Sequence, residues 1–270
     1  MNDTPAESRP PTPADALRFA FGTLTVLPVR VGRWDQATAR GGMLCAPLAG
    51  LVVGLCAAAL GGVLLLLGGG PLLAAVASAA VPAALTRGLH LDGLADTADG
   101  LGSGKPAEDA LRIMKQSDIG PFGVITLLFT LLAQVAALYE LYADGWARGA
   151  LAAAVAAVTA RCALTLASRA GVPAARPEGL GAAVAGTVPV RAALLCAALV
   201  VALCAAAGAV FTPSGASGAL HAGLAAVAGL GLAELVLRHC RRRFGGVTGD
   251  VFGALAESAG LTALIVLALG

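Results

Sequence analysis

Three aspartates, Asp92, Asp96 and Asp99, lie in the stretch HLDGLADTADGLGSG at residues 90–104. Their spacing of four and then three residues would place all three carboxylates on one stripe of a helix. Such carboxylates repel one another, and each costs about 2.5–3.5 kcal/mol at the centre of a bilayer, so the stripe needs water or a cation. Oxygen ligands suit Mg²⁺, which usually keeps several waters and is shared with substrate phosphates. The spacing therefore predicts a magnesium site, with a solvated acidic face as the alternative.

Two further acidic residues occur where the last apolar stretch begins, in GGVTGDVFGALAE. Asp250 would head a helix there, and it either N-caps that helix or ligates metal. Glu257 lies two turns further along the same face, where it needs a metal, an arginine such as Arg161 or a polar substrate as its partner. We predict that Asp250 joins the three aspartates in the metal site, and that Asp250 or Glu257 accepts a proton from a substrate hydroxyl. All five carboxylates are thus candidate catalytic residues.

Four basic side chains are candidate ligands for substrate phosphates. Lys115 ends a short amphipathic segment, and an anchoring lysine at a span boundary is the alternative. Arg161 lies inside an apolar stretch, where an arginine either has a function or snorkels to the surface. Arg169 and Arg176 can each grip two phosphate oxygens, because the guanidinium group is planar and bidentate, although Glu178 competes by pairing with one of them.

The composition of the chain places these residues in a membrane protein. The 270 residues are 58% hydrophobic and only 13% charged, with a mean hydropathy of +0.84, whereas about a quarter of the residues of a soluble domain are charged. A membrane span needs about 20 mostly apolar residues. Seven stretches meet or approach this length: 43–67, 71–86, 119–142, 149–168, 191–211, 218–237 and 251–270. We therefore predict an all-α, polytopic helical bundle with about seven transmembrane helices, of which the second is short.

The basic residues predict how this bundle is oriented. With seven spans, the arginines and lysines form four groups on one side of the membrane, whereas the opposite loops hold only Arg148. Loops rich in lysine and arginine face the cytoplasm. We expect the N-terminus in the cytoplasm, the C-terminus outside, and the acidic and basic motifs on the cytoplasmic face.

The N-terminal segment differs from the rest of the chain. Residues 1–13 are rich in proline and polar residues, which predicts a disordered lead, and they lack the basic start and apolar run of a signal peptide. The apolar stretch 14–29 is short, which favours an interfacial helix, a re-entrant hairpin or a helix packed on the bundle. Because the connections between the spans are short, we predict a single transmembrane catalytic domain over 14–270.

The motifs that the sequence lacks narrow the chemistry. It contains no CxxC pair, no Walker loop, no Ser-His-Asp set and no redox motif. Carboxylates and arginines on one membrane face suit a phosphate substrate, because Mg²⁺ can orient a pyrophosphate while arginines steady the transferring phosphate. The expected reaction is transfer from a nucleotide-diphospho donor to an alcohol or phosphate acceptor. A transporter is the non-enzymatic alternative, but transporters place such charges near the bilayer midplane.

Four motifs together resemble one enzyme family. LHLDGLADTADGLG, RIMKQSDIGPFG, ARPEGLG and GGVTGDVFGALAE occur in this order between the predicted spans. From about Leu17 onwards, the sequence resembles the adenosylcobinamide-GDP ribazoletransferases, also called cobalamin-5′-phosphate synthases. The family's Asp-rich motif matches Asp92, Asp96 and Asp99, and its later Gly-Asp motif matches residues 249–250.

The resemblance implies the last assembly stage of the cobalamin nucleotide loop. Adenosylcobinamide-GDP would react with α-ribazole or its 5′-phosphate, release GMP and yield adenosylcobalamin or its 5′-phosphate. The resemblance also implies Mg²⁺ dependence and a multi-pass protein of the bacterial inner membrane, with its active site facing the cytoplasm. The lipid bilayer, a second copy of the chain and other corrinoid-pathway enzymes are expected partners, and nucleic acid is not. Asp118 stands where many members have a basic residue, so a phosphate clamp is lost there and a carboxylate is gained.

Two other classes of membrane enzyme use aspartate motifs and Mg²⁺. The motif of CDP-alcohol phosphotransferases has an arginine soon after DGxxA, whereas in this sequence Asp96 follows Ala95. Intramembrane prenyltransferases normally show two comparable Asp-rich motifs, whereas Asp250 stands alone in its motif. Both classes remain alternatives to ribazole transfer on the sequence alone.

Overall fold

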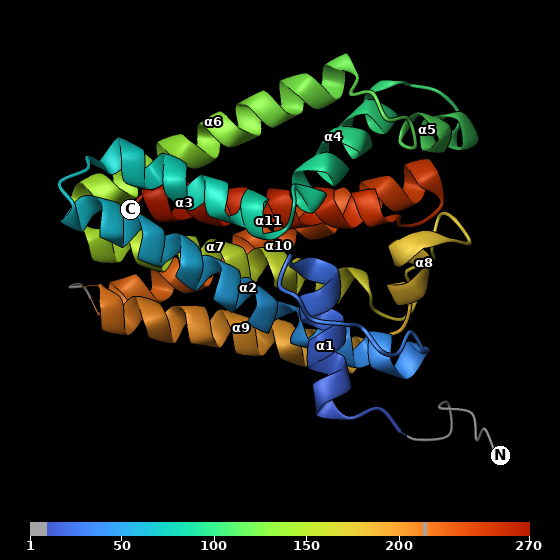
Figure 1. The fold of residues 1–270 in the computed structure, drawn as a ribbon, viewed down its shortest axis with the longest axis horizontal. Helices are drawn as coiled ribbons and strands as arrows, with labels where there is room; N and C mark the ends of the chain where they lie inside the picture. The colour runs from blue at the N-terminus through green and yellow to red at the C-terminus, as the bar shows by residue number, and fades with distance from the viewer. Residues whose placement is uncertain (1–9, 213–214) are drawn as a thin grey trace.

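The computed structural model describes residues 10–212 and 215–270, and these residues form α-helices without a β-sheet (Figure 1). The long helices run roughly side by side, and the short helices α5 and α8 lie at one end, to the right in Figure 1. In chain order the helices of the described residues are α1 (Pro13–Leu24), α2 (Gln36–Leu66), α3 (Pro71–Leu85), α4 (Leu89–Gly102), α5 (Ala107–Ile113), α6 (Pro121–Asp144), α7 (Trp146–Ala167), α8 (Gly179–Val184), α9 (Val190–Phe211), α10 (Ala216–Phe244) and α11 (Gly249–Ala268).

Six of the described helices are long and apolar enough to cross a membrane, namely α2, α6, α7, α9, α10 and α11. A seventh span exists only if α3 and α4 are counted together, and these two helices meet at an angle of 86°. The 15 residues of α3 extend about 22 Å, less than the roughly 30 Å of a bilayer core. The prediction of an all-α polytopic bundle is confirmed, and its short second span ends in a sharp bend.

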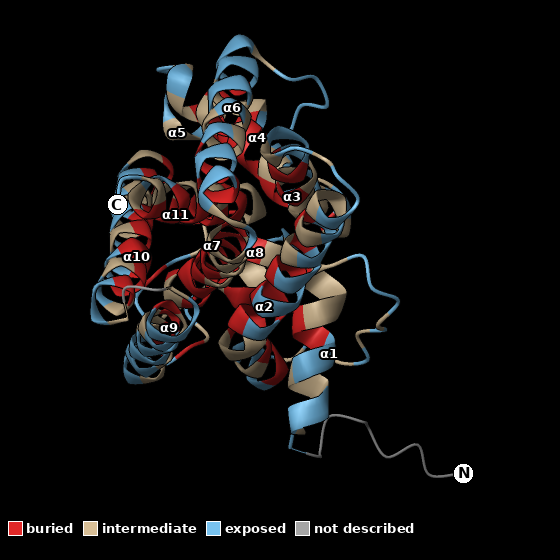
Figure 2. Ribbon diagram, turned by 90° about the vertical axis from the view of Figure 1, so that its left-hand side faces the viewer, coloured by how far each residue is buried: buried red, intermediate tan, exposed pale blue. Residues whose placement is uncertain are grey.

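Helix α7 forms the centre of the bundle. In its most apolar stretch, 78% of the residues are buried. Helices α2, α6, α9, α10 and α11 all pack against it (Figure 2). Glycine in α2 lets two backbones approach, because a Cβ at Gly54 would lie only 2.8 Å from the Cα of Ala154. Small residues are typical of such interfaces in membranes, where close packing rather than escape from water drives helices together.

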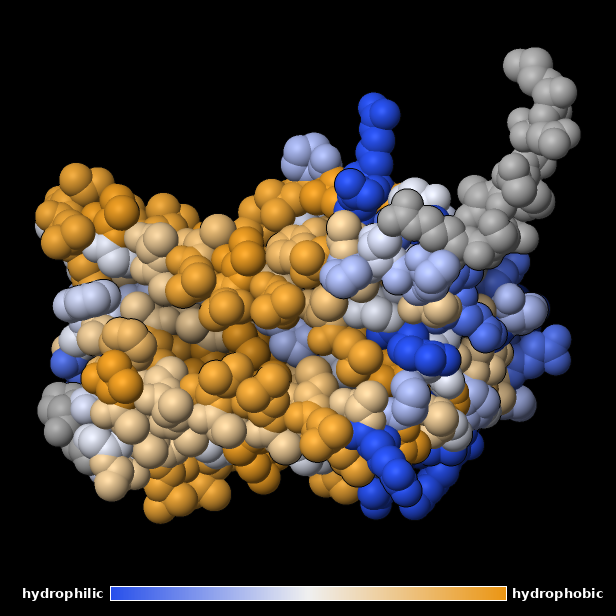
Figure 3. Space-filling view, turned by 90° about the horizontal axis from the view of Figure 1, so that it is seen from below, coloured by the Kyte–Doolittle hydropathy of each residue, from blue (hydrophilic) through white to orange (hydrophobic). Residues whose placement is uncertain are grey.

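The outer surface of the bundle is apolar along most of its length and polar at one end. Figure 3 shows hydrophobic residues along the flank, with hydrophilic residues gathered at the end that carries α5 and α8 in Figure 1. Leu195, Leu199 and Leu203 of α9 are each more than half exposed. Such exposure would be costly in water but not in lipid, so the flank suits a bilayer and the polar end suits water-soluble ligands.

Helix α1 packs on the bundle, which was one of the three arrangements expected for 14–29. Phe19 is fully buried and contacts Gly42 of α2. Its ring also meets the Trp34 ring edge to face, with centroids 5.3 Å apart. Of the predicted disordered lead, residues 1–9 lie outside the described residues, and Pro13 already begins α1.

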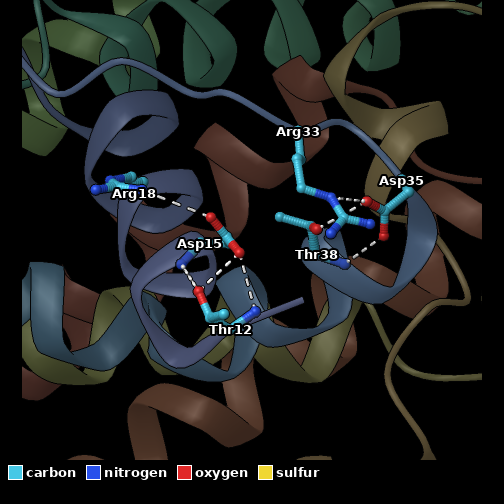
Figure 4. A network of polar contacts seen from close by, with 6 residues as sticks. All are labelled: Thr12, Asp15, Arg18, Arg33, Asp35 and Thr38. Carbon is cyan, nitrogen blue, oxygen red and sulfur yellow. Dashed lines mark hydrogen bonds and ion pairs between the residues drawn. The ribbon is translucent and has the colours of Figure 1, made fainter. Parts of the chain in front are cut away.

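Polar contacts fix where α1 and α2 begin (Figure 4). Thr12 and Asp15 form a capping box at the start of α1. Asp35 caps α2 by accepting hydrogen bonds from the amide and hydroxyl of Thr38, and Arg33 Nε lies 2.9 Å from the same carboxylate. The hydrogen bond from the Thr38 amide lowers the pKa of Asp35. Each cap satisfies backbone amides at the first turn of its own helix.

The bend between α3 and α4 depends on two residues in the left-handed conformation. Arg87 has φ +52° and Gly88 has φ +72°, and Arg87 is the one non-glycine residue with positive φ in the described part of the chain. Their amides donate to the carbonyls of Ala84 and Ala83, which closes the last turn of α3. Gly88 adopts this conformation freely, whereas it costs roughly 1–2 kcal/mol at Arg87.

Candidate active site

An open cleft of about 930 Å³ lies where α1, the α3–α4 bend and the segment before α6 meet. Asp92 and Asp96 of α4 line this cleft together, one helical turn apart. Trp34, Arg87 and Asp118 contribute further parts of its walls. A volume of several hundred Å³ is typical of sites that bind small molecules, so the cleft is the candidate substrate site.

Two glycines bring α4 against α11, the helix that carries Asp250. A Cβ at Gly93 would lie 2.6 Å from the Asp250 carbonyl oxygen and 2.8 Å from its Cα. A Cβ at Gly253 would lie 2.7 Å from the carbonyl oxygen of His90. Backbone atoms cannot yield as a flexible side chain does, so glycine is required at both positions. The crossing places Asp250 beside the carboxylates of α4.

Asp250 is not the N-cap of α11, so the capping interpretation is wrong. Thr248 caps the helix, and its hydroxyl accepts a hydrogen bond from the Val251 amide. The Thr248 hydroxyl donates to Asp250 Oδ2 at 3.1 Å, and Arg176 Nη1 lies 3.5 Å from the same oxygen. Asp250 and Arg176 therefore form an ion pair next to the cleft.

A short bridge between two loops brings Arg176 to Asp250. The Ala175 amide donates to the Val247 carbonyl at 2.9 Å, and the Val247 amide donates to the Pro173 carbonyl at 2.9 Å. One loop joins α7 to α8 and the other joins α10 to α11. Their pairing holds the arginine at the start of α11, where the first turn of the helix also favours a negative side chain.

The carboxylates of this site carry more negative charge than nearby residues neutralise. The charges of Asp92, Asp250 and Asp99 act on Asp96, against one positive charge from Arg176. Within the described residues, no three or more Asp, Glu, His or Cys side chains are arranged as a complete metal cage. Mg²⁺ does not require one, because one or two carboxylates commonly hold it together with water and substrate phosphates. The donor set therefore fits a Mg²⁺ ion that is shared with a phosphate substrate.

Asp99 makes different contacts from the other two aspartates of the stripe. Its side chain is buried, and its two oxygens accept hydrogen bonds from the amides of Gly120 and Gly123 at 2.8 and 2.9 Å. These amides begin α6, so Asp99 satisfies the free end of that helix from α4. The structure does not bring Asp99 into the cleft.

Two of the four predicted phosphate ligands pair with carboxylates and do not line the cleft. Lys115 Nζ lies 2.5 Å from Glu178 Oε1, and this hydrogen bond lowers the pKa of Glu178. Arg169 Nη2 lies 2.9 Å from Glu234 Oε1, an oxygen that also pairs with Arg238. Glu178 was expected to pair with Arg169 or Arg176, and it pairs with Lys115 instead.

The structure places Arg161 and Glu257 inside the bundle. Both line a cavity of about 60 Å³ whose walls come from α2, α3, α4, α6, α7 and α11. Glu257 Oε2 accepts a hydrogen bond from Gln134 Nε2 at 2.8 Å. Neither Arg161 nor Glu257 lines the cleft that contains Asp92 and Asp96.

Arg87 is a cleft residue that the sequence motifs do not single out. It lies in the left-handed bend, five residues before Asp92, and lines the same cleft. Strained backbone conformations cluster at functional sites, where the surrounding structure holds them. A basic residue directly before an acidic helix is the signal that could have found it. Only the bend between α3 and α4, however, puts it on the wall of the cleft.

The helical bundle and its acidic cleft define a multi-pass membrane protein with a site suited to phosphate chemistry. The family model for cobalamin-5-phosphate synthase matches residues 16–268. This chain therefore belongs to the cobalamin-5-phosphate synthase family, whose members are transferases of cobalamin biosynthesis.

Curated relatives of this chain carry the name adenosylcobinamide-GDP ribazoletransferase. The protein from Frankia casuarinae is 44% identical, over 93% of this chain and 94% of its own length. The protein from Nocardioides sp. is 40% identical, over 91% and 94% respectively. The protein from Bradyrhizobium diazoefficiens is 39% identical, over 93% and 92%. No solved structure matches the chain.

Proposed function

We propose that this protein joins adenosylcobinamide-GDP to α-ribazole or α-ribazole 5′-phosphate, the transfer for which its relatives are named. GMP is released, and adenosylcobalamin or its 5′-phosphate is formed. The observation that carries the proposal is the cleft lined by Asp92 and Asp96, with Asp250 and Arg176 beside it. Carboxylates and an arginine at an open cleft suit a pyrophosphate that is held through a cation.

In this proposal Asp92, Asp96 and Asp250 hold Mg²⁺. When bound, the metal neutralises and orients the pyrophosphate of the donor. Arg176 contacts the same phosphates, because its guanidinium already lies beside Asp250. Asp99 supports the site by capping α6. The proposed metal ligands are therefore three of the four aspartates that the sequence suggested.

The reaction breaks the phosphoanhydride bond of the donor and forms a phosphoester bond to the acceptor. Since the 5′-phosphate of the acceptor survives in the product, the attacking oxygen is a ribose hydroxyl. It bonds to the phosphorus that carries the cobinamide arm, the bond from that phosphorus to the bridging oxygen breaks, and GMP leaves with that oxygen. The hydroxyl proton passes to Asp250, which lies next to the cleft, whereas Glu257 lies in the internal cavity.

We further propose that the polar end faces the cytoplasm of a bacterial inner membrane. At this end Arg241 and Arg243 of α10 donate hydrogen bonds to the carbonyls of Gly171 and Lys105. At the opposite end Arg148 pairs with Asp144 at 2.6 Å. An excess of basic residues on the side of the cleft supports a cytoplasmic active site. It also supports the N-terminus on that side.

Product analysis by mass spectrometry tests the function directly. Purified protein in nanodiscs is mixed with adenosylcobinamide-GDP, α-ribazole 5′-phosphate and Mg²⁺, with EDTA in a parallel sample. We expect GMP and a cobalamin product in equal amounts, both lost with EDTA. Well-folded protein that releases no GMP would refute the transferase proposal, and uptake of corrinoid into sealed vesicles would then favour a transporter.

Arg87→Gly removes a side chain from the cleft while keeping the backbone of the bend. We expect KM for adenosylcobinamide-GDP to rise about 10- to 100-fold, because a charge-assisted contact to phosphate contributes about 1.5–3 kcal/mol. Steady-state kinetics at saturating acceptor measures this change. Arg112→Gln, on the exposed face of α5, is the matched control and should leave KM unchanged. An unchanged KM in Arg87→Gly would show that Arg87 does not contact the donor.

A further inference from the structure

A small cavity in the middle of the bundle is lined by four polar side chains among apolar ones. Its volume is about 60 Å³, and it is lined mostly by alanines and leucines together with Arg161, Glu257, Gln134 and Ser78. The cavity is distinct from the cleft of the α4 carboxylates, with which it shares no lining residue. It has room for about two water molecules, since one water occupies about 30 Å³ in the liquid.

Arg161 lines this cavity, and some of its hydrogen-bond donors have no partner among the described residues. Its side chain is 3% exposed, and its Nε and Nη2 atoms have no hydrogen-bond partner among the described residues. Its backbone cannot easily shift, because Gly50 of α2 packs directly on the Ala157 carbonyl and the Arg161 Cβ. A buried guanidinium with unsatisfied donors is costly, so the cavity must supply acceptors.

Glu257 is the counter-charge, but the protein does not join it to Arg161 directly. The two charges act on each other, yet no nitrogen–oxygen contact within 4.0 Å links them among the ion pairs of the described residues. Both side chains line the same cavity. Water that bridges two such groups is nearly as favourable as a direct hydrogen bond.

The cavity also touches the helix that carries the catalytic carboxylates. Leu91 of α4 lines it. The neighbouring His90 is 3% exposed, has no partner for either ring nitrogen among the described residues, and lies within the field of Arg161. His90 also forms the contact with Gly253 at which α4 crosses α11.

We propose that Arg161, Glu257 and Gln134 bind a cluster of water molecules in this cavity, and that the hydrated ion pair holds α4 against α11. Arg161 and Glu257 are then positioning residues, which act on the reaction through the placement of Asp92 and Asp96. The positioning role is measured through kcat, so this part of the inference rests on the proposed transferase function. The water cluster itself is tested without activity.

X-ray radiolytic footprinting detects the water, because hydroxyl radicals label side chains next to bound water molecules. Leu138 and Leu264 line the cavity, although they are only 3% and 5% exposed. Leu164 and Leu237 are also buried, at 1% each, and do not line it. We expect the first pair to be labelled at least about fivefold faster than the second. Equal labelling of the two pairs would show a dry cavity and overturn the proposal.

Charge removal tests the positioning role. Arg161→Met and Glu257→Leu each leave one buried charge without a partner, and each should lower the unfolding temperature by about 10 °C. The double variant leaves no unpaired charge, so we expect its unfolding temperature to return to that of the wild type while Leu138 and Leu264 lose their labelling. Its kcat should stay about tenfold below that of the wild type, while KM for the donor is unchanged. Residues that support metal ligands without touching the metal typically show a loss of this size when they are mutated.

The outcomes separate the possible roles. A double variant with normal kcat would overturn the positioning role, because the ion pair would then be purely structural. A double variant with a raised KM and normal kcat would also overturn it, in favour of direct substrate contact. If the wild type has no transferase activity, the proposed function fails, and the labelling alone still decides whether the cavity binds water.

Discussion

Asp92→Asn and Asp96→Asn are each expected to lower kcat/KM by about two to three orders of magnitude. Both carboxylates line the cleft, and asparagine keeps their shape while it removes the negative charge that a cation needs. Metal stabilisation of the transferring phosphate is typically worth several kcal/mol, and about 1.4 kcal/mol corresponds to a tenfold change in rate. Initial rates of GMP release across a Mg²⁺ titration measure the effect, and the apparent Mg²⁺ affinity should fall with the rate.

The matched control is Asp109→Asn on α5, an acidic residue at the polar end that pairs with Arg112 outside the cleft. It should retain the activity of the wild type. Asp92 and Asp96 line an open cleft and Asp109 is exposed, so their substitution leaves no buried charge unpaired, and all three variants should insert and show the same unfolding temperature. Near-normal transfer by Asp92→Asn and Asp96→Asn at saturating Mg²⁺ would exclude them as metal ligands.

Gly93→Ala is expected to lower kcat by about a hundredfold, although it adds only one methyl group. That methyl group would lie 2.6 Å from the Asp250 carbonyl oxygen, so α4 must move away from α11. The shift separates Asp250 from Asp92 and Asp96, and a displacement of about 1 Å at a catalytic site commonly costs a hundredfold in rate. Steady-state kinetics and the unfolding temperature, measured on the same preparation, separate a misplaced site from an unfolded protein.

Gly231→Ala in α10 is the control for this variant, because a Cβ there has no atom within 4 Å. It adds the same methyl group to the interior of another helix and should leave kcat unchanged. Equal kcat values for Gly93→Ala and Gly231→Ala would show that the α4–α11 crossing does not set the geometry of the site. A second alanine, at Gly253, should reproduce the effect of Gly93→Ala from the other helix.

The bend between α3 and α4 explains how an acidic helix fits into so apolar a protein. The left-handed residues Arg87 and Gly88 end a short apolar helix and start α4 at an angle of 86° to it. One face of α4 then packs on α11 through Gly93, while Asp92 and Asp96 line an open cleft. The carboxylates remain in contact with water or a cation, so the cost of burying them in lipid is avoided.

The sequence by itself determined the class of fold and the centre of the site. Apolar length is a local property, so the stretches of about 20 residues correspond to the long helices of the structure. Helical spacing is also local, and a separation of four residues was enough to place Asp92 and Asp96 on one face. Four spaced motifs were specific enough to indicate the family that the comparison then confirmed.

Only the tertiary structure decided what each charged side chain meets. Asp99 continues the same stripe, but the end of α6 lies beside it and takes both its oxygens. Arg161 was expected at the substrate phosphates and instead enters a cavity lined by six helices, whereas Arg87 reaches the cleft because the chain bends there. The physical reason is that helix geometry fixes the direction of a side chain relative to its own axis, whereas its partners come from helices far away in the sequence.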